Sequence, residues 1–311
     1  MMIKTKEPLV VVWCLTYNQK AFIRTALDGF VMQETNFPFE VVVHDDASTD
    51  GTTEIIKEYE EEYPEVITPM IEVENQWRKG GLKEIIAILN KHHRRGKYIA
   101  FCEGDDFWTD PHKLQCQVDF LETHPDYSMC FHNAKKQYEC NSTTWIDCEN
   151  IEDRDYSATE IFVNWTIPTA SVVCRKEAMD FYSKLRGAER IQNYDIFIFL
   201  SCAMIGKLRG INSQMSVYRI QNEGLTYNSE AMKQTKMRNP DHFKCLKENF
   251  PVVDTKPVDK TISKTFFERA LIRHSICLTL LDYAHSLYYC PTLFFKMYGN
   301  YLLKCISSKR E

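Results

Sequence analysis

Short, mostly apolar runs mark the first predicted elements of the chain. Residues 9–15 (LVVVWCL), 39–43 (FEVVV) and 98–102 (YIAFC) predict strands. The first of these runs does not alternate with polar residues, which favours a central strand buried on both faces of a parallel sheet. Apolar residues recur at helical spacing over 19–31 and again over 52–63. This β-α-β-α order predicts a right-handed crossover, which places ligands at the carboxyl ends of the strands.

Weaker patterns predict the remaining elements. A third strand over 66–73 is interrupted by Pro69, and a helix over 82–89 leads into the strand at 98–102. Asp110-Pro111 predicts the start of a helix that His124-Pro125 ends. Further strands are predicted at 128–132, 169–174 and 215–218, and further helices at 176–185, 196–204, 230–249, 260–289 and 291–306.

Composition and charge exclude several classes of protein. The chain has 311 residues, of which 44% are hydrophobic and 26% charged, as in ordinary globular proteins. The net charge is -5 and no basic stripe dominates, so we expect no nucleic-acid partner. The 12 cysteines include no CxxC pair, which is typical of reduced thiols in a cytoplasmic protein and argues against structural zinc. We find neither a signal peptide nor an apolar run long enough for a membrane span.

Acidic side chains follow two of the predicted strands. Glu103, Asp105 and Asp106 come directly after the strand at 98–102, on a loop that leads into a helix. Carboxylates held close together are unfavourable unless a cation or hydrogen bonds compensate them, so a divalent metal is one reading and a solvated acidic loop is the other. Asp45 and Asp46 follow the strand at 39–43, and we therefore expect both clusters at the same sheet edge.

These motifs resemble those of family-2 glycosyltransferases. The resemblance rests on Thr16-Tyr17-Asn18, the stretch HDDASTDGT at 44–52, and Glu103-Gly104-Asp105-Asp106, in the same order and spacing over about residues 8–225. It implies the glycosyltransferase type A fold, an α/β architecture with a Rossmann-like, mixed but mainly parallel central sheet flanked by helices. It also implies a catalytic domain at 1–225, with a nucleotide-binding half (1–125) and an acceptor half (126–225), followed by a helical region at 226–311.

The resemblance assigns a nucleotide pocket to the strand ends. Asp46 matches the position that accepts a hydrogen bond from uracil, and Tyr17 could stack on the base, although a core aromatic is the alternative for Tyr17. The other residues implied to line this pocket are Thr16, Asn18, Asp45, Asn75 and Asp105.

A metal site is implied at the acidic loop. Asp105 would face the ribose and the metal, and Asp106 would coordinate Mn²⁺ or Mg²⁺, which stabilises the charge that develops on the leaving diphosphate. Glu103 stands where the family more often has Asp, so its role is open.

The acceptor side is implied by later positions. Asp195 matches the family's catalytic base, and a helix N-cap is the alternative for this carboxylate. Trp165 and Thr169 lie where similar enzymes meet the acceptor, although local packing explains them equally well. Arg219 could pair with phosphate or brace the core, and Gln221 replaces a family histidine.

The implied activity is metal-dependent, inverting transfer of a hexosyl or N-acetylhexosaminyl group from a nucleotide-sugar, most simply a UDP-sugar. The acceptor would be a glycan or lipid-linked glycan of surface polysaccharide biosynthesis. Two alternatives stay open. A nucleotidyltransferase would share the sheet and the acidic loop, but it commonly has a glycine-rich phosphate loop, and residues 16–20 contain no glycine. A non-catalytic protein that binds sugar nucleotides or assembles with partners is left open by Glu103 and Gln221.

Aromatic and basic residues interleave near the carboxyl end. Phe294, Phe295, Tyr298 and Tyr301 alternate with lysines over 294–310. Such a helix could lie on an anionic membrane surface, cover the core or contact another subunit. We therefore expect a cytoplasmic protein, with peripheral contact to the inner face of the membrane and a homo-oligomer both left open.

Overall fold

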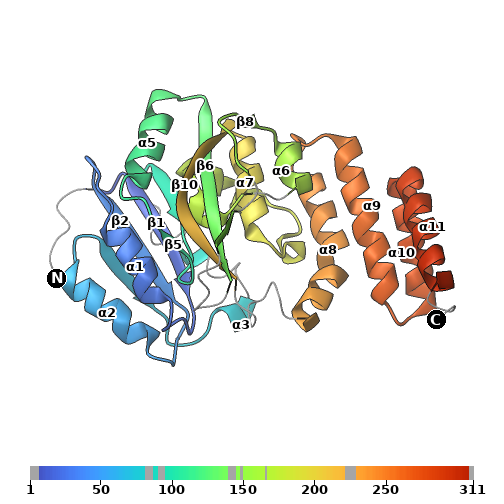
Figure 1. The fold of residues 1–311 in the computed structure, drawn as a ribbon, viewed down its shortest axis with the longest axis horizontal. Helices are drawn as coiled ribbons and strands as arrows, with labels where there is room; N and C mark the ends of the chain where they lie inside the picture. Colours follow the sequence, from blue (N-terminus) through green and yellow to red (C-terminus); the bar gives the residue numbers. More distant parts are fainter. Residues whose placement is uncertain are drawn as a thin grey trace. The chain divides into compact units, whose positions relative to one another are not determined.

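The computed structural model describes residues 7–80, 87–89, 95–138, 145–147, 150–164, 167–220 and 229–307. The chain divides into two units (Figure 1). The first comprises Met1–Ser157, Trp165–Lys184 and Ile198–Gln221, and the second comprises Ala158–Asn164, Leu185–Phe197 and Asn222–Glu311. The second unit thus combines two short segments from the middle of the chain with the carboxyl-terminal part.

Four parallel strands form the first half of the sheet in the first unit. They run in the order β3-β2-β1-β4, with helices on the connections, as the apolar runs predict. The elements are β1 (Val10–Thr16), α1 (Ile23–Val31), β2 (Phe39–Asp45), α2 (Thr52–Glu62), β3 (Ile67–Ile71) and β4 (Tyr98–Phe101). β3 continues through Pro69, which pairs with Val43, because an edge strand tolerates a proline.

The rest of the sheet is mixed. It continues from β4 in the order β9-β6-β10-β5, with β7 paired to β6 and β8 to β10, and β6–β10 is its parallel pair. The elements of this part are α3 (Trp77–Gly80), β5 (Phe107–Trp108), α5 (Lys113–Thr123), β6 (Tyr127–Tyr138), β7 (Trp145–Asp147), β8 (Asp155–Tyr156), η1 (Thr169–Ser171), β9 (Val173–Arg175), η2 (Lys176–Lys184) and β10 (Lys207–Ile220).

Two predicted elements of this region are wrong in part. The strand expected at 169–174 begins with the 3₁₀ turn η1, because the Ser171 hydroxyl and amide both donate to the Pro168 carbonyl, at 2.6 and 2.9 Å, and close a turn there. The helix expected at 176–185 is the 3₁₀ segment η2. The helix expected at 82–89 lies mostly outside the described residues, and only 87–89 are seen, as helix.

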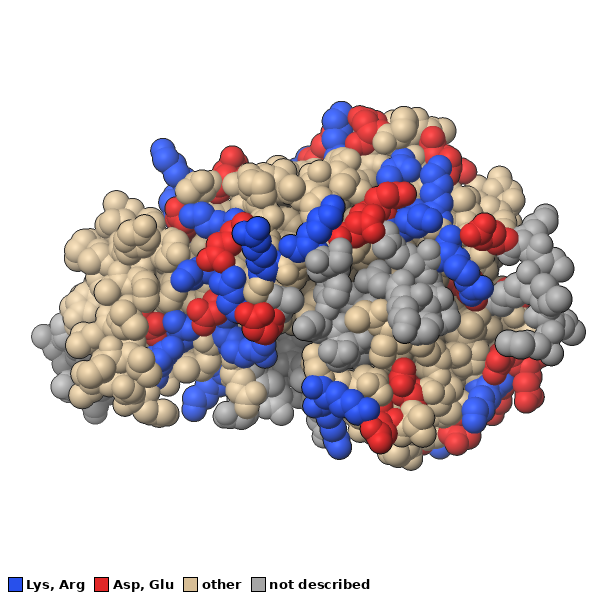
Figure 2. All heavy atoms as spheres, turned by 180° about the vertical axis from the view of Figure 1, so that it is seen from behind, with Lys and Arg blue, Asp and Glu red and all other residues tan. Residues whose placement is uncertain are grey.

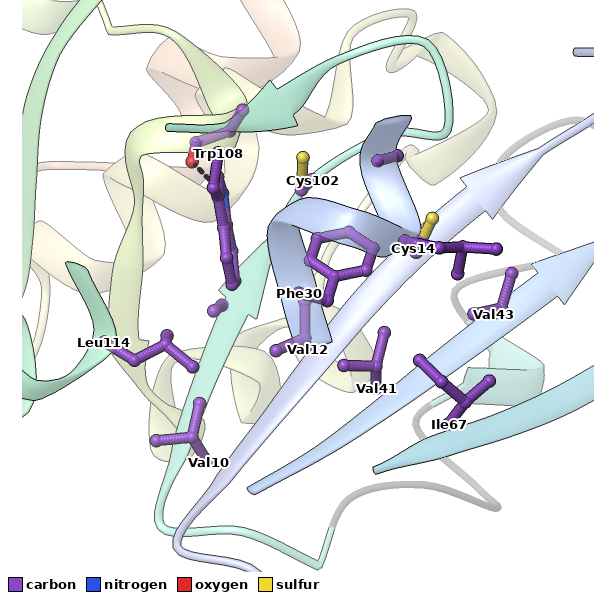
Figure 3. Close-up of a cluster of buried hydrophobic side chains, with 14 of the residues drawn as sticks. Val10, Val12, Cys14, Phe30, Val41, Val43, Ile67, Cys102, Trp108 and Leu114 are labelled. Atoms are coloured by element: carbon purple, nitrogen blue, oxygen red, sulfur yellow. Dashed lines mark hydrogen bonds between the residues drawn. The ribbon is translucent and has the colours of Figure 1, made fainter. Parts of the chain in front are cut away.

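The main core lies between the parallel strands and the helices α1, α2 and α5. Figure 3 shows Val10, Val12 and Cys14 of β1 on the same side of the sheet as Phe30 of α1, and all four are fully buried. Trp108 closes this core, with its ring 4.9 Å from Phe30 in an edge-to-face arrangement. Burial of this side of β1 by α1 therefore fixes the strand whose carboxyl end carries the first motif.

A lysine is buried beside this core. The Lys113 side chain is fully buried, and its Nζ lies 4.1 Å from the centroid of the Trp108 ring. Nζ donates to Gln117 Oε1 at 2.8 Å, and Gln117 Nε2 donates to the Ser171 carbonyl at 2.9 Å. Burial lowers the pKa of Lys113 to about 7, because the charged ammonium loses its hydration.

Helices make up the described part of the second unit. They are α6 (Ala158–Asn164), η3 (Ala188–Arg190), the start of α7 (Tyr194–Ala203), α8 (Ser229–Asn249), α9 (Thr255–Ile272), α10 (Ile276–Tyr289) and α11 (Pro291–Ser307). The helix expected over 260–289 is two helices, because Arg273 takes an extended conformation after α9. Within the described ranges, no helix has both the length and the apolar character to cross a membrane.

Candidate active site

The carboxyl ends of β1, β2 and β4 meet at one sheet edge. Thr16 at the end of β1 is in register with Asp45 at the end of β2. The ladder continues past both strands, because Asp46 N donates to the Thr16 carbonyl at 3.0 Å and Gly104 N donates to the Leu15 carbonyl at 2.8 Å. The motifs at 16–18, 44–52 and 103–106 therefore lie together, as the sequence predicts.

Hydrogen bonds join the loops that follow β1 and β2. Asn18 and Ala47 have positive φ angles of 50° and 64°, which side-chain-bearing residues rarely adopt. Asn18 N donates to Ser48 Oγ at 2.8 Å, and Asn18 Oδ1 accepts from Thr49 N at 2.8 Å. Two further bonds connect the amides of Gln19 and Lys20 to the side chains of Thr52 and Asp50. The Asn18 carboxamide, predicted to line the pocket, thus holds the neighbouring loop in place.

Asp45 has a similar structural task. Its side chain is fully buried, with Oδ1 accepting from Ser48 N at 3.0 Å and Oδ2 accepting from the Thr53 hydroxyl. These bonds fix the turn between β2 and α2. Asp45 therefore acts on this turn through its backbone, and the sequence did not single out Thr53 or Ser48 as its partners.

Asp46 binds the backbone at the start of α3. Its Oδ1 accepts from Gln76 N at 2.5 Å and its Oδ2 from Trp77 N at 3.0 Å. Asn75 donates to the Asp46 carbonyl at 3.1 Å and accepts from Arg78 N at 2.9 Å. The predicted base-binding residue thus also anchors the segment after β3, and a nucleobase would use the lone pairs that these amides leave.

Tyr17 lies at the surface of this edge. It is 40% exposed, so the alternative of a core aromatic is wrong. Thr16 is buried beside it and donates to Gln19 Oε1 at 2.8 Å. A Cβ at Gly104 would lie 2.6 Å from that same Gln19 oxygen and 2.8 Å from Thr16 Oγ1. The acidic loop therefore approaches β1 more closely than a residue with a side chain would allow.

Arg219 holds the acidic loop from β10. Its Nη1 donates to the Asp105 carbonyl at 2.9 Å, and its backbone N donates to Asp106 Oδ1 at 2.9 Å. The guanidinium also lies 4.4 Å from the centroid of the Phe107 ring. These contacts attach Arg219 to the loop that carries the acids.

Negative charge accumulates around Asp106. Its side chain is buried, and burial, reinforced by the neighbouring Asp105 and Glu103, raises its pKa well above the ordinary value, while Arg219 opposes the rise. The same acids add to burial in raising the pKa of the Cys14 thiol beneath them. An ionised Asp106 therefore requires more positive charge than Arg219 supplies.

A divalent cation fits these residues. Among the described residues, no three or more His, Cys, Asp or Glu side chains are arranged to hold a metal by themselves. Mg²⁺ is commonly bound by one or two carboxylates together with substrate phosphates and water, rather than by a cage made of protein alone. Asp105 and Asp106 are a donor set of that kind.

Asp195 belongs to the second unit. α7 begins at Tyr194, so Asp195 lies in the first turn of the helix rather than at the residue before it. Asp195 is half-buried, and Gln192 just before it donates through its backbone N to His242 Nδ1 of α8 at 3.3 Å. A carboxylate in this turn is favoured by the helix dipole. Thr169 is half-buried at the start of η1, and Trp165 and Gln221 lie outside the described residues.

A family comparison identifies the chain. The sequence model described as glycosyl transferase family 2 matches residues 12–181, more than half of the 311 residues. The chain belongs to this family. An uncharacterized protein of Mycobacterium tuberculosis is 35% identical to this family member over 215 residues, which cover 69% of this chain but only 60% of the relative. The UDP-Glc:alpha-D-GlcNAc-diphosphoundecaprenol beta-1,3-glucosyltransferase WfaP of Escherichia coli is 30% identical over 117 residues, 37% of this chain and 42% of WfaP.

Solved structures confirm the fold expected for the family. Staphylococcus aureus TarS 1-349 in complex with UDP-GlcNAc has a TM-score of 0.56 at 15% identity, covering 94% of this chain and 92% of that one. The mannosyltransferase PcManGT of Pyrobaculum calidifontis, in complex with GDP-Man and Mn²⁺, has a TM-score of 0.53 at 18% identity, with 96% and 86% covered. The glycosyltransferase type A fold predicted from the motifs is therefore confirmed.

Proposed function

We propose that the protein is a metal-dependent, inverting glycosyltransferase that moves a hexosyl or N-acetylhexosaminyl group from a UDP-sugar to a glycan or lipid-linked glycan. The observation that carries this proposal is the acidic loop at 103–106, where the buried Asp106 lies among other acids at the same sheet edge as Thr16, Tyr17 and Asp46. Synthesis of surface polysaccharide at the cytoplasmic face of the membrane is the proposed setting. The lipid-linked substrate in the name of WfaP supports it.

The strand ends form the donor side of the proposed site. Tyr17, which is 40% exposed, offers a flat surface for the base, and Asp46 accepts from its ring N–H. Asn18, Asp45 and Asn75 act as positioning residues, because their side chains fix the loops that carry the pocket. The UDP-GlcNAc bound by TarS supports a uridine donor, and the GDP-Man bound by PcManGT marks guanosine as the competing choice.

Asp105 and Asp106 hold Mn²⁺ or Mg²⁺ in the proposed mechanism. When bound, the metal neutralises the negative charge that develops on the leaving diphosphate. Arg219 keeps both acids at the loop through its contacts with the Asp105 carbonyl and Asp106 Oδ1. Glu103 adds negative charge next to Asp106 and so strengthens the requirement for the cation.

Asp195 is the proposed base. It takes the proton of the acceptor hydroxyl while that oxygen attacks the anomeric carbon on the face opposite the diphosphate, which inverts the configuration. It lies in the first turn of α7, the end of a helix that attracts negatively charged groups. Trp165 and Thr169 are proposed contacts of the acceptor. In this scheme, residues 1–125 bind the nucleotide, 126–225 bind the acceptor, and the helical region at 226–311 follows them.

Hydrolysis of a panel of sugar nucleotides, with and without Mn²⁺, tests this function. We expect one donor to be hydrolysed in a metal-dependent manner, and Asp106→Asn to lower that rate about 100-fold or more. Asn matches the shape of a protonated carboxyl and can still accept the Arg219 N–H, so the fold should persist. Asp119→Asn, at an exposed carboxylate of α5, is the matched control.

Three outcomes would contradict the proposal. Undiminished metal-dependent turnover by Asp106→Asn would show that Asp106 is not required to bind the metal. Release of pyrophosphate from a nucleoside triphosphate would indicate a nucleotidyltransferase. Tight binding of UDP-sugars without turnover on any acceptor, together with co-purifying partners, would indicate a non-catalytic binding protein.

A further inference from the structure

α10 and α11 present six large exposed apolar side chains, which we call the α10–α11 face. It consists of Ile276, Leu280, Leu281, Tyr288, Phe295 and Leu303. Their exposed fractions run from 51% for Leu281 to 80% for Tyr288. Single exposed apolar residues are ordinary, but six large ones on two consecutive helices form a patch of the kind that marks an interaction site.

The charge on α10 is turned away from this face. Asp282 is the one Asp, Glu, Lys or Arg in Ile276–Tyr289, and its side chain is buried. It pairs with Arg269 of α9 at 2.8 Å and with Arg273 at 2.7 Å. Figure 2 shows the matching surface at its left edge, where a broad area contains no blue or red atoms. The outer side of α10 therefore offers only apolar, aromatic and small polar groups.

Lys296 lies on α11, the helix that contributes Phe295 and Leu303 to the α10–α11 face. Residues 283–311 contain the basic Lys296, Lys304, Lys309 and Arg310 and one acid, Glu311. Lys296 is exposed on α11. A second copy of the chain on this face would bring two Lys296 side chains together with no exposed acid on α10 or α11 to pair with them, whereas anionic headgroups complement them.

The aromatic residues favour the same occupant. Tyr288 is 80% exposed, and Tyr298 and Tyr301 are 38% and 40% exposed. Tyrosines of this kind, with an apolar ring and a polar hydroxyl, are enriched at the boundary between headgroups and acyl chains. A protein partner of neutral surface would satisfy the aliphatic residues but would leave Lys296 without a counter-charge.

We propose that the α10–α11 face binds the surface of an anionic lipid bilayer, with Ile276, Leu280 and Phe295 entering the acyl boundary and Lys296 meeting the headgroups. The helices would lie in the plane of the membrane, as amphipathic interfacial helices do. The proposal rests on the chemistry of this face and not on the proposed transfer reaction.

Sedimentation with vesicles tests the proposal on the full chain. We expect binding to vesicles of phosphatidylcholine that contain phosphatidylglycerol, weaker binding to phosphatidylcholine alone, and loss of the difference at high salt. The double variant Ile276→Asp, Leu280→Asp should bind the anionic vesicles about tenfold or more weakly. Val252→Asp is the matched control, because Val252 is a 42% exposed apolar residue outside the face, and it should bind as the wild type does.

A second double variant controls for an effect of the first on folding. Tyr288→Ser with Phe295→Ser adds no charge and should produce the same loss, with an unchanged circular dichroism spectrum. Equal vesicle binding by wild type and both double variants would overturn the proposal. A second result would also overturn the proposal. If the wild type dimerises but does not bind anionic vesicles, and both double variants abolish the dimer, the face binds a second copy of the chain. The vesicles contain neither donor nor acceptor, so these outcomes are independent of sugar-nucleotide turnover.

Discussion

Lys113 makes the cost of a buried cation measurable. Its side chain is fully buried, and burial lowers its pKa from 10.5 to about 7. Between these two pH values the unfolded chain binds a proton at Lys113 that the folded chain has lost, so the free energy of unfolding rises with pH across this window. The difference between the two pKa values corresponds to about 5 kcal/mol, which the folded protein loses in full at acid pH.

Lys113→Met should remove this pH dependence. Methionine matches lysine in length and fills the space beside the Trp108 ring without a proton to lose. The variant leaves Gln117 Oε1 without its donor, which costs about 1–3 kcal/mol at every pH. We therefore expect the variant to be the more stable protein at pH 7, and its advantage over the wild type to fall by about 2 kcal/mol between pH 7 and pH 9.

Urea unfolding of both proteins at pH 7, 8 and 9 measures this difference. The buried thiols and carboxyls are common to both, so subtraction leaves the contribution of Lys113. Lys97→Met is the control, because Lys97 is half-exposed, is bonded to Glu122 at 2.7 Å and has a raised pKa, and its difference from the wild type should stay constant. A constant difference for Lys113→Met as well would refute the reasoning from burial.

Two further predictions concern the acidic loop and the second unit. Gly104→Ala should weaken UDP binding at least tenfold in calorimetry, because its Cβ would lie 2.8 Å from Thr16 Oγ1. Gly299→Ala has open space around its Cβ and should raise the free energy of unfolding by about 0.5–1 kcal/mol. Equal UDP affinities of the two variants would contradict the assigned contact at Gly104. Arg269→Met should cost about 3–5 kcal/mol in urea unfolding, because it removes one of the two cations beside the buried Asp282; a loss below about 1 kcal/mol would show that Arg273 suffices.

The parallel half of the sheet was predictable because its signals are local. The run at 9–15 is apolar without a break, and it forms the buried strand β1. The acids at 45–46 and 103–106 follow strands directly, so the parallel register that brings Thr16 level with Asp45 gathers them at one edge. Each inference required only a short stretch of sequence and a general rule about parallel sheets.

The elements that escaped prediction depend on distant partners. β5 is two residues long and exists because Phe107 and Trp108 pair with Val217 and Ser216 of β10. Residues 169–174 have the composition of a strand, but the turn that Ser171 makes with Pro168 delays β9 to Val173. Tertiary pairing creates the strand in the first case. In the second, a local side-chain bond outweighs strand propensity.

The same limit applies to the candidate site. The motifs predicted Asn18, Asp45 and Asn75 as pocket residues, and each bonds to the backbone of a loop. For Asn18 that loop lies 31 residues away in the sequence. A motif records that a polar residue is required at a position, but the partner that its side chain selects emerges only once the chain has folded.

The bonded loops after β1 and β2 have a consequence for redesign of the donor pocket. Asn18 and Asp46 each support the loop backbone, so a substitution at either would change fold integrity and ligand preference together. Tyr17 sits next to Asn18 with 40% of its surface open, and its ring is not part of the core. Libraries of variants that begin at Tyr17 can therefore search for acceptance of new nucleotides while the scaffold stays intact, which makes this position the natural first step toward an altered substrate range.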